Sequence, residues 1–96
     1  MSDIIEKAVE ALNARLDGDG FDGSVKVEIE GEGSLVVDGD GARAGDGDAD
    51  CTLMADAETF QGMLEGEVNP TSAFMTGKLS VDGDMGAAMK LGALLS

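Results

Sequence analysis

The sequence predicts an α/β (α+β) domain with one five-stranded, mostly antiparallel sheet and helices packed on one face. The first observation is length, because 96 residues make one domain and leave no room for a second, so residues 1–96 form a single unit. The second is order: a helix, four strands in an antiparallel meander, two short helices, a strand and a last helix. The third is composition, since 43% apolar residues support a buried core.

The first predicted element is an amphipathic helix over residues 3–17, in which apolar side chains recur at helical spacing. Acidic residues open the segment and Arg15 lies near its end, which suits the helix dipole. Gly18 predicts where the helix stops. The apolar stripe consists of Ile4, Ile5, Ala8, Val9, Leu12 and Leu16.

Four strands are predicted next, separated by glycine-rich turns. The first alternates strictly between apolar and charged side chains, which is typical of a half-buried strand. Cys51 lies on the fourth strand without a nearby His or Lys, so we expect a small buried apolar side chain there instead of a reactive thiol. The strands are expected at residues 24–30, 34–38, 42–44 and 50–55.

Helices and one strand alternate in the rest of the chain. Asp56 is a good N-cap for a helix that Gly66 ends. Asn69–Pro70 is a strong start for a short helix over residues 71–76, because proline suits the first helical position. Residues 78–82 alternate as a fifth strand.

The last helix, residues 85–95 with Asp84 as its cap, is apolar almost all round and has Lys90 as its one charge. It is too short to span a bilayer. Such a helix must pack against the rest of its own chain or fill a groove in a partner. The second possibility predicts a non-catalytic interaction module with no lipid role.

Charge excludes several classes of function. The formal net charge is −14, from 20 acidic and 6 basic residues, which argues against nucleic acid as a partner. It also argues against steady docking on anionic membranes, and the absence of a long apolar run argues against membrane insertion. The chain has no His, so the commonest catalytic base and metal ligand is missing. We therefore expect no enzyme activity and no cofactor.

The Asp-Gly segments resemble calcium loops without completing one. A loop that starts at Asp46 would use Asp46, Asp48 and Asp50, but Cys51 stands where glycine is needed and Ala57 where glutamate is needed. Tight turns are the favoured interpretation, because glycine supplies positive φ and aspartate bonds its own backbone. A calcium-responsive protein remains the alternative.

A single cysteine excludes an internal disulfide, and residues 1–7 lack the basic and apolar parts of a secretory leader. Both features predict a cytoplasmic protein.

Residues 50–95 resemble the sterol carrier protein 2 domain family, also called non-specific lipid-transfer proteins. Residues 49–53, Ala-Asp-Cys-Thr-Leu, are similar to a strand of that family. The longest matching run, residues 66–79, has the family's spacing of Gly, Asn-Pro, Ala-Phe and Gly-Lys-Leu. Residues 81–84 and 88–91 follow in the same register.

This resemblance implies helices and a sheet that enclose an apolar tunnel for a hydrophobic small molecule: a fatty acid, fatty acyl-CoA, phospholipid or sterol-like ligand. A lipid-metabolising enzyme is the implied protein partner. The best-known members are basic, whereas this chain is acidic, so we expect it to hold a ligand in solution. The C-terminal residues Ala-Leu-Leu-Ser are not the Ser-Lys-Leu peroxisomal address, which predicts a bacterial or cytosolic setting. Without the resemblance, the apolar positions would be typical of ordinary core. The implied ligand-binding residues are Phe60, Met63, Phe74, Met75, Leu79, Val81, Met85, Met89, Leu91 and Leu94.

Overall fold

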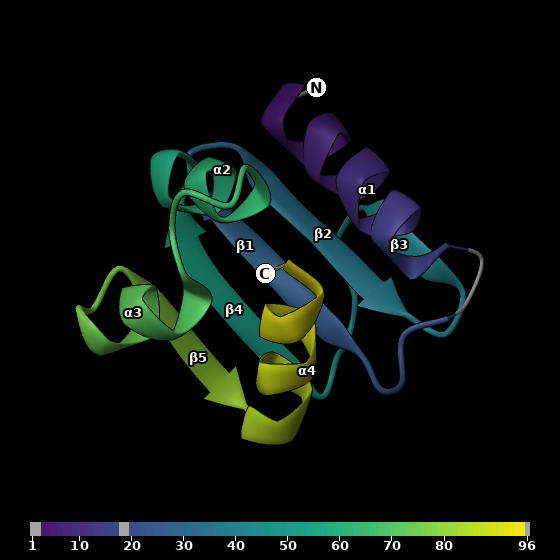
Figure 1. Ribbon diagram of the computed structural model, residues 1–96. Helices are drawn as coiled ribbons and strands as arrows, with labels where there is room; N and C mark the ends of the chain where they lie inside the picture. The colour runs from purple at the N-terminus through teal and green to yellow at the C-terminus, as the bar shows by residue number, and fades with distance from the viewer. Residues whose placement is uncertain (1–2, 18–19, 96) are drawn as a thin grey trace.

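The computed structural model describes residues 3–17 and 20–95 of the chain. Nine elements follow one another along the described residues, and Figure 1 labels them. They are α1 (Asp3–Leu16), β1 (Val25–Glu30), β2 (Gly33–Asp38), β3 (Gly41–Ala44), β4 (Cys51–Asp56), α2 (Ala57–Leu64), α3 (Pro70–Met75), β5 (Leu79–Gly83) and α4 (Met85–Leu95). Each predicted element is present, and its bounds differ from the prediction by at most two residues. Gly18, the predicted stop of the first helix, lies outside the described residues.

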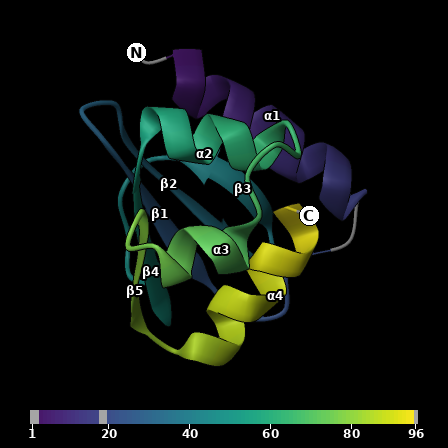
Figure 2. The same cartoon turned by 60° about the vertical axis from the view of Figure 1, so that its left-hand side comes forward.

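The sheet has five strands in the order β3-β2-β1-β4-β5, and Figures 1 and 2 show the helices on one side of it. Three of its pairings are antiparallel, which confirms a mostly antiparallel sheet. The predicted meander of the first four strands is wrong, because β4 pairs in parallel with β1, Val25 beside Cys51. The hairpins β1-β2 and β2-β3 leave one edge of β1 free, and β4 adds to that edge.

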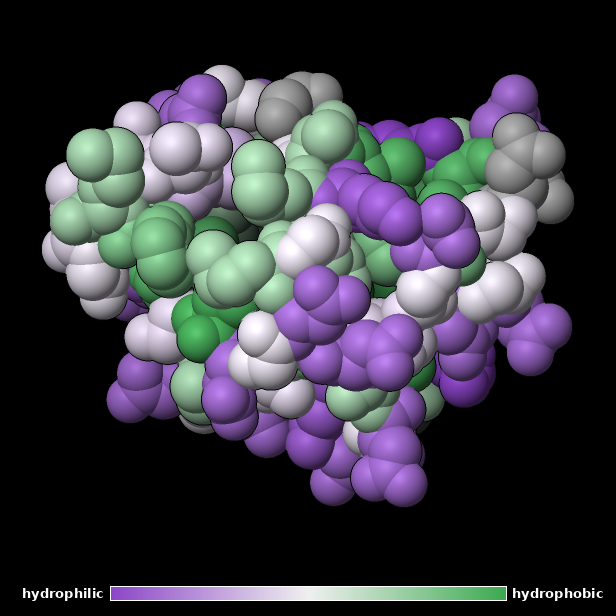
Figure 3. Space-filling model, turned by 90° about the horizontal axis from the view of Figure 1, so that it is seen from below, coloured by the Kyte–Doolittle hydropathy of each residue, from purple (hydrophilic) through white to green (hydrophobic). Residues whose placement is uncertain are grey.

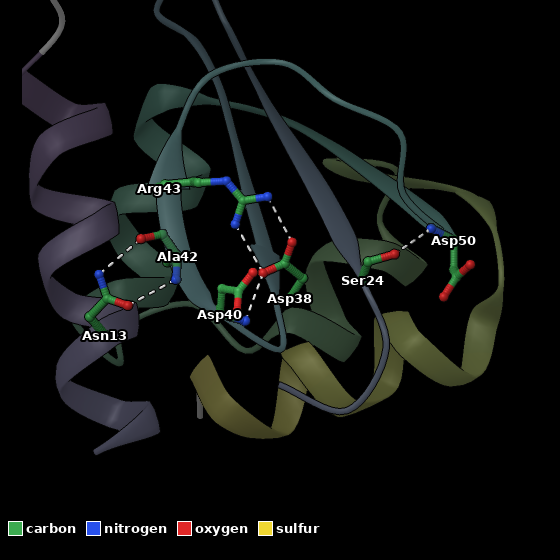
Figure 4. Close-up of polar contacts among 7 residues, drawn as sticks. All are labelled: Asn13, Ser24, Asp38, Asp40, Ala42, Arg43 and Asp50. Carbon is green, nitrogen blue, oxygen red and sulfur yellow. Dashed lines mark hydrogen bonds and ion pairs between the residues drawn. The ribbon is translucent and has the colours of Figure 1, made fainter. Parts of the chain in front are cut away.

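The parallel pairing requires the chain to cross the sheet between β3 and β4, and it does so on the face without helices. The Lys26 ammonium, which projects from β1 onto that face, pairs with Asp46 of the crossing segment and with Glu28, the latter at 3.2 Å. Val36 is buried on the same face. The Ser24 hydroxyl accepts a hydrogen bond from the Asp50 backbone N–H at 2.9 Å where the segment enters β4 (Figure 4). These contacts hold the crossing in place.

The core lies between the sheet and the helices. The alternating residues of β1 predicted to point inward, Val25, Val27 and Ile29, are all buried. Leu12 of α1 and Phe60 of α2 are fully buried against this layer. α1 packs on β3 and β2, whereas α4 packs on β4, β1 and β5. The helical cover therefore divides into an α1 end and an α4 end.

The α1 end is closed by side-chain hydrogen bonds. The Asn13 amide donates to the Ala42 carbonyl at 3.0 Å and accepts from the Ala42 N–H at 2.8 Å, so it occupies the outer edge of β3 (Figure 4). A Cβ at Gly41 would lie 2.8 Å from the Asn13 side-chain oxygen, and Gly41 also has φ of 108°. Glycine is therefore required beside this contact.

Arg15 fastens the ends of two other helices to α1. Its guanidinium donates to the Leu64 carbonyl at 2.7 Å and to the Leu94 carbonyl at 3.2 Å, at the C-terminal turns of α2 and α4. Carbonyls in the last turn of a helix lack partners within the helix, and a cation there also suits the helix dipole. Arg15 thus aligns α1, α2 and α4 on the sheet.

The β2-β3 turn is held by an ion pair. Arg43 donates to both carboxylate oxygens of Asp38, at 2.9 and 2.7 Å, and the Asp40 backbone N–H donates to one of them (Figure 4). The Arg43 hydrogen bonds, and then that of Asp40, lower the pKa of Asp38 from 3.8 to about 2. The turn is therefore tied to a carboxylate that stays ionised in mild acid.

Candidate functional site

An apolar groove of about 370 Å³ opens between α3, α4 and the β4-β5 side of the sheet, and we name it the α3–α4 groove. Its volume lies within the ~300–1,000 Å³ typical of small-molecule sites. Among the described residues that line it, none carries a charge. The lining consists of Leu53, Asn69, Pro70, Thr71, Phe74, Leu79, Val81, Met85, Ala88, Met89, Gly92 and Ala93.

Two strands form the floor of the groove. Leu53 of β4 pairs directly with Val81 of β5, and Leu79 lies two residues before Val81, so all three point to the helix side of the sheet. Leu53 and Leu79 are buried, and Val81 is half-buried. The floor of the groove is therefore continuous with the hydrophobic core between the sheet and the helices.

α4 has two apolar faces with different roles. One face, which carries Ala87 and Leu91, is buried in the core. The second carries the groove residues Met85, Met89 and Gly92, which recur at helical spacing. This division explains why the helix is apolar almost all round. The first face packs on the chain's own sheet, as one of the two predicted possibilities required.

Caps position both helices beside the groove. The Asn69 side-chain oxygen accepts hydrogen bonds from the Thr71 and Ser72 backbone N–H groups, at 2.8 and 3.3 Å, at the start of α3. The Asp84 carboxylate accepts from the Gly86 N–H at 2.9 Å and begins α4. The predicted caps at Asn69 and Asp84 are therefore confirmed, as is the cap at Asp56 on α2.

Small side chains keep the groove open. Ala88, Gly92 and Ala93 lie on the α4 face that lines it. A Cβ added at Gly92 would meet the Cβ of Pro70 at 3.6 Å, an ordinary contact distance, so α3 and α4 approach closely at this point. Bulky residues at these positions would fill the space between the two helices.

The rim of the groove exposes large apolar side chains. Met89 is 72% exposed, Met85 46% and Phe74 44%. Lys90, the one charged residue of α4, is absent from the lining and pairs with Asp22 at 2.9 Å. Figure 3 shows hydrophobic residues gathered around a hollow towards the left of that view, with hydrophilic residues along the lower edge. Contiguous exposed apolar patches on a protein surface mark interaction sites or ligand-binding grooves.

The structure brings together half of the predicted ligand-binding residues. Three others, Phe60, Met63 and Leu91, are buried in the core, and Leu94 is half-buried against it. Met75 is 80% exposed and lies outside the lining. Those that line the groove are Phe74, Leu79, Val81, Met85 and Met89.

Sequence reasoning missed the small and polar members of the lining. Ala88, Gly92 and Ala93 follow Met85 and Met89 at spacings of three and four, so a helical projection would have grouped them. Asn69 and Thr71 supply the polar lining at the start of α3.

Within residues 3–17 and 20–95, the structure offers no site for metal binding, for a reactive thiol or for a membrane span. No group of carboxylates or Cys side chains there could hold a metal ion, and Asp46 of the proposed calcium loop pairs with Lys26. Cys51 is 1% exposed, as predicted for a small apolar side chain. Burial, together with the charges of Asp84 and Asp82, raises the pKa of its thiol. None of the described helices combines the length and apolar character that a bilayer span needs.

The family follows from a match over the length of the chain. The model of the SCP-2 sterol transfer family matches residues 3–96. The chain belongs to this family. The resemblance expected from the second half of the sequence is therefore confirmed, and the match also includes the first half.

Relatives and solved structures agree with the family. Sterol carrier protein 2 of Homo sapiens is 54% identical over 44 residues, and hydroxysteroid dehydrogenase-like protein 2 of Danio rerio is 46% identical over 48. These stretches are 45% and 50% of this chain, but only 8% and 12% of those proteins. The sterol carrier protein domain 2 of Helicoverpa armigera superposes with a TM-score of 0.77 at 25% identity, over 96% of this chain and 85% of that one.

A second solved structure has the same fold at lower identity. Sterol carrier protein 2 of Aedes aegypti, determined in complex with palmitate, superposes with a TM-score of 0.78 at 18% identity. The superposition covers 100% of this chain and 97% of that one.

Proposed function

We propose that the protein binds the hydrocarbon chain of a fatty acid in the α3–α4 groove and carries it without catalysing a reaction. The observation that carries the proposal is an open groove whose described lining is apolar and uncharged, in a member of the SCP-2 sterol transfer family. The palmitate complex of the Aedes aegypti protein supports a fatty acid as the ligand class. Fatty acyl-CoA, phospholipid and sterol-like ligands share the apolar part and are the competing ligands to test.

The groove supports useful affinity through burial alone. Each methylene removed from water contributes ~0.8 kcal/mol, so about twelve buried methylenes contribute on the order of 10 kcal/mol before binding costs. Loss of ligand freedom offsets at least ~4 kcal/mol of this. A net gain of at most ~6 kcal/mol corresponds to dissociation constants of roughly tens of micromolar or weaker.

The polar lining at the start of α3 suits the carboxylate of such a ligand. The Asn69 side-chain oxygen is engaged by the α3 cap, which fixes the orientation of the amide. Its NH₂ group and the Thr71 hydroxyl are hydrogen-bond donors, and both residues line the groove. We propose that the ligand headgroup lies at Asn69 and Thr71, with the hydrocarbon chain running towards Met85.

Charge and relatives suggest how the ligand is used. A net charge of −14 opposes docking on anionic membranes, which favours holding a ligand in solution. The long relatives, among them hydroxysteroid dehydrogenase-like protein 2, support delivery to a lipid-metabolising enzyme. The alternative role is an interaction module that uses α4. Of the two apolar faces described for this helix, that role could use the groove face, because the face with Ala87 and Leu91 is buried in the core.

The test is a titration with fluorescently labelled palmitate. Gly92→Leu places a bulky side chain between α4 and Pro70, and it raises local helix propensity by roughly 1 kcal/mol, so the helix itself is not weakened. We expect saturable binding by the unmodified protein and at least tenfold weaker binding by Gly92→Leu. Ala14→Leu, on an exposed position of α1, is the matched control. Equal affinity of all three proteins would place the ligand elsewhere, and no saturable binding would refute the proposal.

A further inference from the structure

Two methionine thioethers lie at the mouth of the α3–α4 groove. Met85 and Met89 are one helical turn apart on α4, both line the groove, and they are 46% and 72% exposed. Side chains four residues apart project from the same side of a helix. Among the described residues of the lining, these two alone carry sulfur.

Other methionines lie in contrasting environments. Met63 is 1% exposed within the core. Met54 is 40% exposed on the sheet face opposite the helices, and Met75 is 80% exposed outside the groove lining. The described residues therefore supply one buried methionine and two exposed methionines that serve as references for the groove pair.

We propose that Met85 and Met89 form an oxidative modification site, at which a hydroperoxide closes the groove to apolar ligands. The inference rests on the proposed function, because it concerns the affinity of that groove. It adds a regulated state, since methionine sulfoxide is returned to methionine by methionine sulfoxide reductases.

The reaction needs only the thioether and the hydroperoxide. A sulfur lone pair attacks the terminal oxygen of the hydroperoxide, the O–O bond breaks and an S–O bond forms. The departing oxygen keeps the bonding electron pair and receives the hydroperoxide proton, which gives an alcohol, or water when the oxidant is hydrogen peroxide. The sulfur loses two electrons and the peroxide gains two.

Oxidation changes the groove because it replaces an apolar side chain with a polar one. A sulfoxide oxygen buried beneath a hydrocarbon chain without a hydrogen-bond donor loses its hydration, and the lining offers no charged donor near α4. Binding and oxidation are also linked in the opposite direction, since a bound chain covers the two sulfur atoms. If oxidation weakens the binding of a ligand, binding of that ligand must in turn disfavour the oxidised form of the protein by the same factor.

The experiment treats the unmodified protein with hydrogen peroxide and follows each methionine by peptide mass spectrometry. We expect Met85 and Met89 to be oxidised well before Met63, and labelled palmitate to bind roughly tenfold more weakly afterwards, which corresponds to about 1.4 kcal/mol. Palmitate added before the peroxide should slow oxidation at Met85 and Met89 but leave the rates at Met54 and Met75 unchanged. Methionine sulfoxide reductase with its thiol reductant should restore the affinity.

Two double variants test which methionines cause the loss of palmitate affinity after peroxide treatment. Met85→Leu/Met89→Leu removes both thioethers with little change of volume, and its palmitate affinity, whatever its starting value, should be the same before and after peroxide. Met54→Leu/Met75→Leu keeps the groove pair and should lose affinity on peroxide treatment as the unmodified protein does.

The outcomes separate the two proposals. If untreated protein binds no palmitate, the proposed function fails and this inference fails with it. If untreated protein binds but the oxidised protein binds equally well, this inference alone is wrong. It is also wrong if the affinity is lost together with the cooperative thermal transition, because the loss would then come from unfolding, or if Met85→Leu/Met89→Leu remains sensitive to peroxide.

Discussion

Each end of the sheet is covered by a helix, the amphipathic α1 at one end and α4, which is apolar almost all round, at the other. The end under the amphipathic helix is filled, whereas the end under the more apolar helix is hollow. At the α1 end, Leu12 is fully buried, Asn13 closes the edge of β3, and Arg15 donates to carbonyls in the last turns of two further helices. At the α4 end, α3 has six residues, of which Ala73 is buried, and the facing side of α4 carries Ala88 and Gly92. The comparison teaches that side-chain size and helix length decide whether a layer becomes core or cavity.

The largest expected effect comes from a truncation at the filled end. Leu12→Ala removes a fully buried side chain from a closed layer and should lower the free energy of unfolding by roughly 2–5 kcal/mol. Met89→Ala at the hollow end should change it by less than about 0.5 kcal/mol, because that side chain is mainly in water. Urea denaturation of both variants measures the contrast. Equal losses would mean that the α4 end is packed as tightly as the α1 end.

A smaller effect is expected where α1 meets the sheet edge. Asn13→Ala deletes both hydrogen bonds to Ala42, which should cost roughly 1–2 kcal/mol of unfolding free energy, less a few tenths returned by the better helix propensity of alanine. The control is Glu10→Ala, an exposed position on the same helix. Urea denaturation reports the loss, and size-exclusion chromatography reports whether the uncovered strand edge pairs with another molecule. A variant as stable as the control would show that β3 needs no cover.

At the hollow end, Phe74→Ala should affect the ligand more than the fold. The ring is half-exposed and lines the groove, so its loss should weaken labelled palmitate binding by roughly fivefold, or about 1 kcal/mol. The change in unfolding free energy should be within about 1 kcal/mol, as for other partly exposed side chains. Fluorescence titration and urea denaturation give the two values. A large loss of stability with unchanged affinity would make Phe74 a core residue.

The smallest expected effect is at the β2-β3 turn. The folded-state pKa of Asp38 is about 2, below its ordinary 3.8, so its ion pair stabilises the fold above pH 3.8 and that contribution is lost as pH falls towards 2. Asp38→Asn should therefore have a lower melting temperature than the unmodified protein at pH 7, and the difference should shrink at pH 2.5. The same difference at both pH values would mean that the carboxylate charge does not stabilise the turn.

Local sequence patterns were sufficient to predict the helices and strands. Alternation of Val25, Val27 and Ile29 identified β1 and its buried face, because strand periodicity is a property of neighbouring residues. Asn69 and Asp84 marked the starts of α3 and α4 for the same reason, since a cap bonds to backbone groups two or three residues away. The run through residues 66–79 was enough to suggest the family.

Tertiary structure alone decided which strands are neighbours and which apolar residues face the groove. The parallel pairing of Val25 with Cys51 joins segments far apart in the sequence, and no local pattern records it. Phe60 and Met85 looked equivalent in the sequence, yet Phe60 is fully buried and Met85 lies at an open rim. The physical reason is that burial depends on what lies opposite a side chain. Met85 lines a groove that the six-residue α3 borders, whereas Phe60 is enclosed within the core. The sequence therefore determined an apolar helix, while packing determined the groove.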